Sequence, residues 1–104
     1  MENFKEISVD QAAQMLTEGK SLFVDVRDPG SFSASHVPGA LHLNDGNIQE
    51  FVSQTDKAKP IVCYCYHGNT SQGAAAYLMD QGFKEVYSVV GGFELWRTTK
   101  KIES

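Results

Sequence analysis

The 104-residue sequence has only two cysteines, Cys63 and Cys65, and a single residue separates them. Positions this close on one strand give a strained disulfide ring, so a disulfide framework is excluded. Cys63, Cys65 and His67 would be the only cluster available to zinc, which wants about four ligands, so we expect no metal and no cofactor. Unpaired thiols favour a cytoplasmic location.

Long apolar runs and excess positive charge are also missing. No apolar stretch approaches the roughly 20 residues of a membrane span. The first six residues lack both a basic flank and an apolar segment, so they do not resemble a secretory signal. The formal net charge is −4, and partners such as nucleic acid or anionic membranes require basic patches. We therefore expect neither nucleic acid nor a membrane as a partner.

The sequence instead alternates between apolar runs and segments of helical spacing. Ser8 followed by Gln11 is a capping-box pattern that predicts a helix start, and Gly19 predicts where that helix ends. We expect strands at 4–7, 22–26, 40–43, 61–65 and 86–90. We expect helices at 9–18, at 29–34, from a cap at Asn44 or Asp45 to 52, at 73–81, and a last one carrying Phe93 and Trp96.

This alternation predicts an α/β fold with a mostly parallel sheet of about five strands and helices on both faces. We expect one domain over 1–104, with its core at about 8–97 and a frayed tail at 98–104. Ligand sites in such sheets lie at the carboxyl ends of the strands. Two chemically interesting segments have that position: Asp25 to Asp28, and Cys65 with the loop after it.

Cys65 ends an apolar run and opens a polar loop that leads into a helix. A thiol in this position faces loop amides and the positive end of a helix, and both favour the reactive thiolate. Gly68 permits a tight turn, and His67 is the loop's only side chain able to carry positive charge near neutral pH. The candidate site is therefore Cys65 as nucleophile with a substrate-binding loop of Tyr66, His67, Gly68, Asn69, Thr70 and Ser71.

Other interpretations of these residues remain open. Cys65 could be a buried structural cysteine, and core packing is the simplest role for Cys63. Arg27 could form a surface ion pair with Asp25 and Asp28, or it could point into the pocket and counter an anion, in which case Asp25 and Arg27 support the site. Phosphatases that use cysteine place an arginine six residues after it. Ser71 occupies that position here, which disfavours phosphatase chemistry.

Several blocks, taken together and in order, resemble the rhodanese domain. The resemblance extends from about Ser8 to Arg97, which is most of the chain. The blocks are 22–29 followed by Phe32, then 36–40, then 61–65 with its short loop, and then 91–96. The resemblance implies a rhodanese-like fold and an enzyme of the sulfurtransferase class.

In such an enzyme Cys65 would take a sulfane sulfur from thiosulfate, release sulfite and carry a persulfide. The acceptor would be cyanide or a thiol or dithiol protein such as thioredoxin. Tyr66 and His67 occupy positions where other rhodaneses carry basic side chains, so we expect weak donor affinity. The alternative from another class is a non-catalytic rhodanese-like module that carries sulfur or binds a protein.

Overall fold

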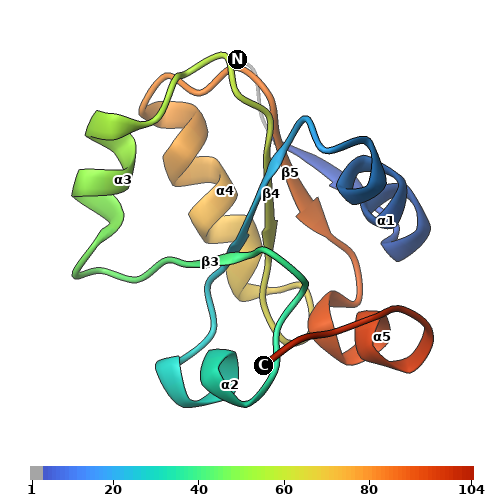
Figure 1. The fold of residues 1–104 in the computed structure, drawn as a ribbon. Helices are drawn as coiled ribbons and strands as arrows, with labels where there is room; N and C mark the ends of the chain where they lie inside the picture. The colour runs from blue at the N-terminus through green and yellow to red at the C-terminus, as the bar shows by residue number, and fades with distance from the viewer. Residues whose placement is uncertain (1–3) are drawn as a thin grey trace.

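A computed structural model describes residues 4–104 of the chain. Residues 1–3, which begin the segment predicted to lack a secretory signal, lie outside the described residues. Strands and helices alternate along the chain (Figure 1). In order they are β1 (Lys5–Ile7), α1 (Val9–Glu18), β2 (Leu22–Asp25), α2 (Pro29–Ala34), β3 (Leu41–His42), α3 (Ile48–Gln54), β4 (Ile61–Tyr64), α4 (Thr70–Asp80), β5 (Val86–Val89) and α5 (Gly92–Thr99).

The five strands form one sheet in the order β1-β5-β4-β2-β3, and every neighbouring pair is parallel. The predicted α/β fold with a mostly parallel five-stranded sheet is confirmed. Strand β4 lies at the centre, and its four residues are all buried. A strand buried on both faces needs a continuous apolar run, and Ile61 to Tyr64 supply one. Cys65 therefore directly follows the central, fully buried strand of the sheet.

Helices cover both faces of the sheet, as predicted. In Figure 1, α3 and α4 lie on one side of the strands and α1 and α5 lie on the other. Each side has its own apolar cluster. Ala12 of α1 packs with Phe93 and Trp96 of α5 on one face, whereas Ala75 and Leu78 of α4 belong to the cluster on the other face.

Local signals set the ends of α1 as predicted. Ser8 and Gln11 form the capping box, because each side chain accepts the other's backbone N–H. Gly19 adopts the left-handed conformation with φ 73°, and its N–H donates to the carbonyls of Met15 and Leu16. Both ends of α1 could be predicted from the sequence because the contacts that set them span only three or four residues.

Helix α3 starts later than the sequence suggested. Asn44 and Asp45 were the predicted caps, but the helix begins at Ile48 after Asn47. The Asn44 side chain instead accepts the N–H groups of Gly46 and Asn47, at 2.8 and 3.1 Å. Asn44 therefore stabilises a turn that precedes the helix, which is a common alternative use of an asparagine side chain.

The C-terminal tail is ordered by pairing, so the prediction of a frayed tail was wrong. The N–H of His36 donates to the carbonyl of Glu103 at 2.8 Å, and the N–H of Glu103 donates back at 2.9 Å. The Glu103 carboxylate also accepts the N–H of Gly39 at 2.9 Å. This tail contact crosses more than 60 residues of sequence, which local pattern analysis does not detect. Within residues 4–104, no helix has the length and apolar character needed to cross a membrane.

Candidate active site around Cys65

The two segments singled out in the sequence meet at one edge of the sheet. Strands β2 and β4 are neighbours, and Asp25 pairs in register with Tyr64. Strand β2 ends at Asp25 and β4 ends at Tyr64, so Asp25 and Cys65 lie at the same edge of the sheet. The parallel topology therefore brings together residues that are 40 positions apart, as strand ends in such sheets do.

The Cys65 sulfur is surrounded by hydrogen-bond donors. The backbone N–H groups of Gly68 and Ser71 point at Sγ from 3.1 and 3.2 Å. The Ser71 hydroxyl lies 3.4 Å from Sγ and 2.8 Å from the Ser88 hydroxyl. When Cys65 is a thiolate, Ser71 donates to the sulfur and accepts from Ser88. In that ionised state three donors converge on one sulfur and form an anion-binding concavity.

These donors favour the ionised form of Cys65. Burial opposes ionisation, but hydrogen bonds from the Ser71 hydroxyl and from the N–H groups of Ser71, Gly68 and His67 outweigh it. The pKa of Cys65 therefore lies below its ordinary value. Burial and the neighbouring Cys65 sulfur raise the pKa of Cys63 to about 12. Cys63 packs within the apolar cluster beneath α3 and α4, which is the core role predicted for it.

The loop after Cys65 begins a helix sooner than predicted. Helix α4 starts at Thr70 and not at Gly73. The first N–H groups of a helix have no partner within the helix. Here the N–H of Ser71 finds one in the Cys65 sulfur. The sulfur therefore acts as an acceptor at the helix N-terminus, and the polar residues before Gly73 can be helical.

The start of α5 supports the other side of the loop. The N–H groups of Phe93 and Glu94 donate to the carbonyls of Cys65 and Tyr66, at 2.8 and 2.9 Å. A Cβ at Gly92 would lie 2.5 Å from the Cys65 oxygen, and Gly92 also has a positive φ of 58°. The Gly91-Gly92 pair belongs to the block 91–96 that resembles the rhodanese domain, but the sequence did not indicate that Gly92 approaches the Cys65 loop. A close approach of two backbones is the second reason for a glycine.

Cys65 lines a pocket of about 520 Å³ between the β2–α2 connection and the start of α4. Seven residues line this pocket: Val26, Arg27, Asp28, Ser31, Cys65, Tyr66 and Thr70. Asp28 caps α2, and hydrogen bonds from the Ser31 hydroxyl and N–H lower the pKa of its carboxyl group. The pocket wall therefore carries a negative charge at neutral pH.

Arg27 and Asp25 form a buried ion pair, which differs from the surface pair that was one of the two interpretations of these residues. The Arg27 Nη2 atom lies 2.6 Å from Asp25 Oδ2, with side-chain exposures of 6% and 0%. Arg27 also donates to the carbonyl of Ser35 at 2.7 Å and lies over the Phe93 ring. Its hydrogen bonds join β2 to the end of α2, and its stacking on Phe93 adds a contact to α5. Arg27 lines the pocket, but its charge is already neutralised by Asp25.

The remaining loop residues divide by position. Gly68 and Ser71 are buried against the sulfur, whereas Tyr66 and Thr70 are exposed and line the pocket. His67 and Asn69 are exposed and do not line the pocket; the His67 ring packs edge-on against the ring of Tyr66. Within residues 4–104, no three His, Cys, Asp or Glu side chains are arranged to hold a metal ion.

Comparisons with known proteins agree with this architecture. The model of the rhodanese-like domain matches residues 8–99. The chain belongs to the rhodanese family. The thiosulfate sulfurtransferase GlpE of Pseudomonas syringae pv. syringae (strain B728a) is 54% identical over 99 residues, which cover 95% of this chain and 92% of that protein.

Solved rhodanese-like structures share the fold. The rhodanese-like domain of the Anabaena sp. Alr3790 protein superposes with a TM-score of 0.85 at 22% identity, over 100% of this chain and 80% of that one. The protein RPA3614 of Rhodopseudomonas palustris CGA009 is described as of unknown function and as a possible tyrosine phosphatase. It superposes with a TM-score of 0.83 at 28% identity, over 96% of this chain and 85% of that one.

Proposed function

We propose that this rhodanese is a thiosulfate sulfurtransferase in which Cys65 is the nucleophile. The observation that carries the proposal is the convergence of two N–H groups and one hydroxyl on the Cys65 sulfur. Its support is the 54% identity to a protein named as a thiosulfate sulfurtransferase. A thiolate held in this way is ready to attack, because thiolate and not thiol is the nucleophilic form.

In the first step the Cys65 thiolate attacks the outer sulfur of thiosulfate. A new S–S bond forms to Cys65, the S–S bond of thiosulfate breaks, and its electron pair leaves with sulfite. The enzyme then carries an anionic persulfide. In the second step a thiolate or cyanide attacks the outer persulfide sulfur, and the electron pair returns to Cys65. Two half-reactions through a covalent intermediate give ping-pong kinetics.

The donors around the sulfur serve both half-reactions. The N–H groups of Gly68 and Ser71 stabilise the thiolate before attack and the negative charge on the persulfide after it. Tyr66 and Thr70 form the pocket wall near the reacting sulfur. Asp25 and Arg27 support the site by fixing the β2–α2 connection that makes the opposite wall.

The charges of the pocket predict weak binding of the donor. Thiosulfate is a dianion, but Arg27 is neutralised by Asp25, and Asp28 adds a negative charge. Among the described residues that line the pocket there is no other cation, so backbone amides are the remaining source of positive potential there. We therefore expect a high KM for thiosulfate, and we expect that KM to fall when the Asp28 charge is removed.

A phosphatase is the competing enzyme class, and it is the description given to one structural relative. Phosphate transfer through a cysteine loop needs an arginine fork on the dianion. The equivalent position is Ser71, which is fully buried and directed at the Cys65 sulfur. This side chain cannot hold a phosphoryl group, so the geometry favours sulfur transfer.

Mass spectrometry of the protein after incubation with thiosulfate tests the proposal. We expect one added sulfur, of about 32 Da, located on Cys65 and removed by cyanide as thiocyanate. Cys63→Ala is the matched control and should load normally, because Cys63 is buried with a raised pKa. Cys65→Ala should neither load nor produce thiocyanate. Thiocyanate production by Cys65→Ala at the wild-type rate would refute the assignment.

The same experiment separates the enzyme from a module that only carries sulfur or binds a protein. An enzyme discharges its persulfide repeatedly, so thiocyanate should exceed the protein concentration many times over. Production that stops at one equivalent with every acceptor would identify a carrier. Loss of Cys65-dependent thiocyanate together with hydrolysis of a phosphotyrosine analogue would instead favour the phosphatase.

A further inference from the structure

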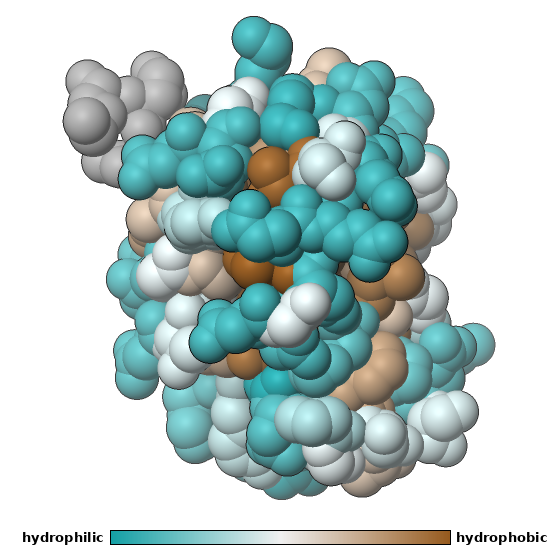
Figure 2. Space-filling model, turned by 90° about the vertical axis from the view of Figure 1, so that its left-hand side faces the viewer, coloured by the Kyte–Doolittle hydropathy of each residue, from teal (hydrophilic) through white to brown (hydrophobic). Residues whose placement is uncertain are grey.

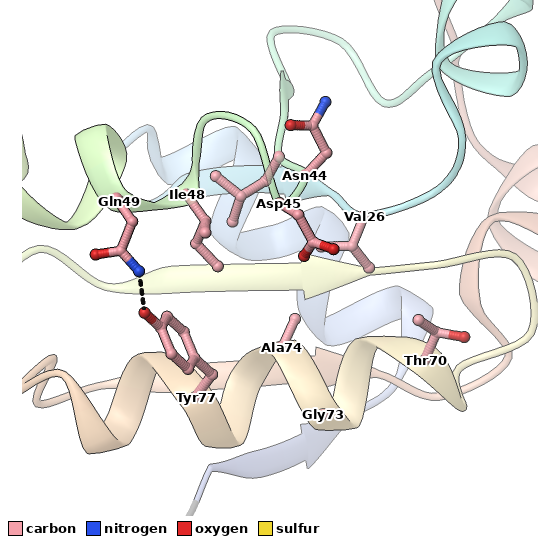
Figure 3. A pocket seen from close by; sticks show the side chains of 10 residues that line it. Val26, Asn44, Asp45, Ile48, Gln49, Thr70, Gly73, Ala74 and Tyr77 are labelled. Carbon is pink, nitrogen blue, oxygen red and sulfur yellow. Dashed lines mark hydrogen bonds between the residues drawn. The ribbon is translucent and has the colours of Figure 1, made fainter.

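A second groove adjoins the Cys65 pocket and has no role in the mechanism above. It has a volume of about 580 Å³ and lies between α4 and the segment that leads into α3 (Figure 3). Its lining residues are Val26, Leu43, Asn44, Asp45, Ile48, Gln49, Thr70, Gly73, Ala74 and Tyr77. Val26 and Thr70 also line the Cys65 pocket, so the two spaces share a wall.

The groove combines apolar side chains with several uncharged polar groups and a single charge. Ile48 faces Ala74 of α4 across it, and Gln49 donates to the Tyr77 hydroxyl at 2.7 Å (Figure 3). Among residues 4–104, Asp45 is the only charged residue that lines the groove. Figure 2, which views the molecule from the α3 side, shows apolar side chains in hollows between hydrophilic ones. A ligand suited to this groove has an apolar body and no negative charge.

Gly73 is an independent sign that the groove is kept open. It lies within α4, where glycine weakens a helix relative to alanine. The fold does not require glycine there, because its φ is not positive and a Cβ would meet nothing within 4 Å. The other glycines near Cys65 are different: Gly68 and Gly92 have positive φ and backbone atoms close by. At Gly73 the missing side chain gives space to the groove.

We propose that this groove binds the carbon chain of the sulfur acceptor. The acceptor is a small thiol with an apolar body and a positively charged or neutral end group. The inference rests on the proposed function, and it adds a separate subsite for the second substrate. Thiosulfate is unsuited to the groove, because it has no apolar part and Asp45 repels a dianion.

The chemistry of the second step fits this placement. With its chain in the groove, the acceptor reaches Cys65 past Val26 and Thr70. Its thiolate attacks the outer sulfur of the persulfide, a new S–S bond forms to the acceptor, and the bond to Cys65 breaks. The electron pair stays on the Cys65 sulfur, which the same N–H groups stabilise. The product leaves as the acceptor's persulfide, and no further oxidant or reductant is needed.

The test measures how fast different thiols remove sulfur from protein that has been loaded with thiosulfate. Three probes have the same six-carbon chain and differ only at the far end: 6-mercaptohexylamine, 6-mercaptohexanol and 6-mercaptohexanoate. Their thiol pKa values are similar because the end group is distant. We expect the amine to have an apparent KM about two- to fivefold below that of the acid, a size typical of one exposed charge pair. This preference should weaken in high salt.

Two variants identify the groove as the source of the preference. Asp45→Asn should equalise the amine and the acid. Asp80→Asn is the matched control, because it removes the same charge at the far end of α4 and should leave the preference unchanged. Gly73→Leu should raise the apparent KM of all three six-carbon probes about tenfold or more. Cyanide, which needs no groove, should discharge Gly73→Leu at the wild-type rate, which also shows that the variant is folded.

The outcomes separate this inference from the proposed function. If Cys65 does not load sulfur from thiosulfate, the proposed function fails first. If loading and cyanide discharge are normal but Asp45→Asn and Gly73→Leu discharge the six-carbon thiols like wild type, the groove is not the acceptor subsite. If Gly73→Leu slows discharge only to reduced thioredoxin, the groove is part of a protein-docking surface and the small-thiol assignment is overturned.

Discussion

At the scale of single residues, Cys63 and Cys65 show how position decides the chemistry of a thiol. A single residue separates the two cysteines, but Cys63 is inside an apolar cluster and Cys65 is beyond the strand end. Burial raises the pKa of Cys63 to about 12. The same effect on Cys65 is outweighed by hydrogen bonds to its sulfur. A thiol-specific reagent should therefore modify the folded protein at Cys65 alone.

Ser71→Ala tests the contribution of the hydroxyl to the Cys65 thiolate. The substitution removes the donor 3.4 Å from Sγ but keeps the N–H of residue 71. The pKa of Cys65 should therefore rise toward its ordinary value. We expect the pH profile of alkylation by iodoacetamide to move to higher pH. We expect kcat/KM for thiosulfate to fall roughly ten- to a hundredfold, the range for one hydrogen bond to a charged group.

Ser88→Ala is the graded comparison for Ser71→Ala. The Ser88 hydroxyl lies 2.8 Å from the Ser71 hydroxyl and orients it. Among the described residues, no hydrogen bond joins Ser88 to the Cys65 sulfur. Its effect on the pH profile should have the same direction and a smaller size. If neither variant shifts the profile, the N–H groups alone hold the thiolate.

The sequence indicated the residues around the Cys65 sulfur that lie in its own loop, but not those that come from other elements. Cys65, Gly68 and Ser71 were all recognisable because they are close in sequence and share a loop. Ser88 was not, because it lies in β5 and reaches Ser71 only after β4 and β5 pair. The burial of Arg27 was missed for a similar reason: Phe93 and Ser35, which enclose it, come from other elements.

The Arg27–Asp25 pair makes a second prediction at this scale. Arg27→Met removes the positive charge and leaves the fully buried Asp25 carboxylate unpaired. Breaking a buried pair in this way costs about 3–5 kcal/mol of the free energy of unfolding. Urea denaturation of the variant should show that loss, and the double variant Asp25→Asn/Arg27→Met should recover part of it. Equal midpoints for wild type and Arg27→Met would show that the pair has no net role in stability.

At the scale of elements, two helix N-termini meet at the Cys65 loop. Helix α4 directs the N–H of Ser71 at the sulfur, and α5 directs the N–H groups of Phe93 and Glu94 at the loop carbonyls. The loop is therefore held from both ends by helix donors that have no partner within their own helices. The sequence predicted both helices, but only the structure shows that α4 begins at Thr70. The N–H of Ser71 donates to the Cys65 sulfur, and the pattern of helical spacing does not reveal this contact.

Gly92→Ala tests the contact between α5 and the loop. A Cβ at this position would lie 2.5 Å from the Cys65 oxygen and 2.6 Å from the Tyr66 oxygen, and its φ is positive. We expect the free energy of unfolding to fall by at least about 2 kcal/mol, because strain and overpacking are among the causes of large destabilisation. The loop should move as well, so sulfur loading of Cys65 should slow even under conditions where the variant stays folded.

Gly73→Ala is the matched control for Gly92→Ala. It makes the same chemical change in a helix near the same loop, but its Cβ meets nothing within 4 Å. Alanine is the better helix former, so stability should increase by up to about 1 kcal/mol. Thermal unfolding of the two variants should therefore change in opposite directions. A similar loss in both would show that the close approach at Gly92 is not the cause.

At the scale of the whole molecule, the C-terminal tail connects the segment after α2 with helix α1. Glu103 pairs with His36 just after α2, and Lys100 contacts Asp10 of α1 at 2.8 Å. Helix α2 begins with Asp28, which lines the Cys65 pocket. The order of the strands and this tail contact were both beyond the sequence analysis, because each depends on residues that meet only in the folded chain.

Glu103→Gln tests how this tail contact depends on pH. Hydrogen bonds from the N–H of Gly39 and from His36 hold the pKa of Glu103 below its ordinary value of 4.5. The ionised carboxylate therefore stabilises the folded tail fully above pH 4.5, and this contribution is lost as the pH falls through the lowered pKa. We expect the N–H groups of His36 and Glu103 to exchange faster in Glu103→Gln near pH 6, with the difference from wild type disappearing at low pH. Glu18→Gln, at the exposed end of α1, should match wild type at every pH. A difference between wild type and Glu103→Gln that persisted at low pH would show that the side chain acts through its shape and not its charge.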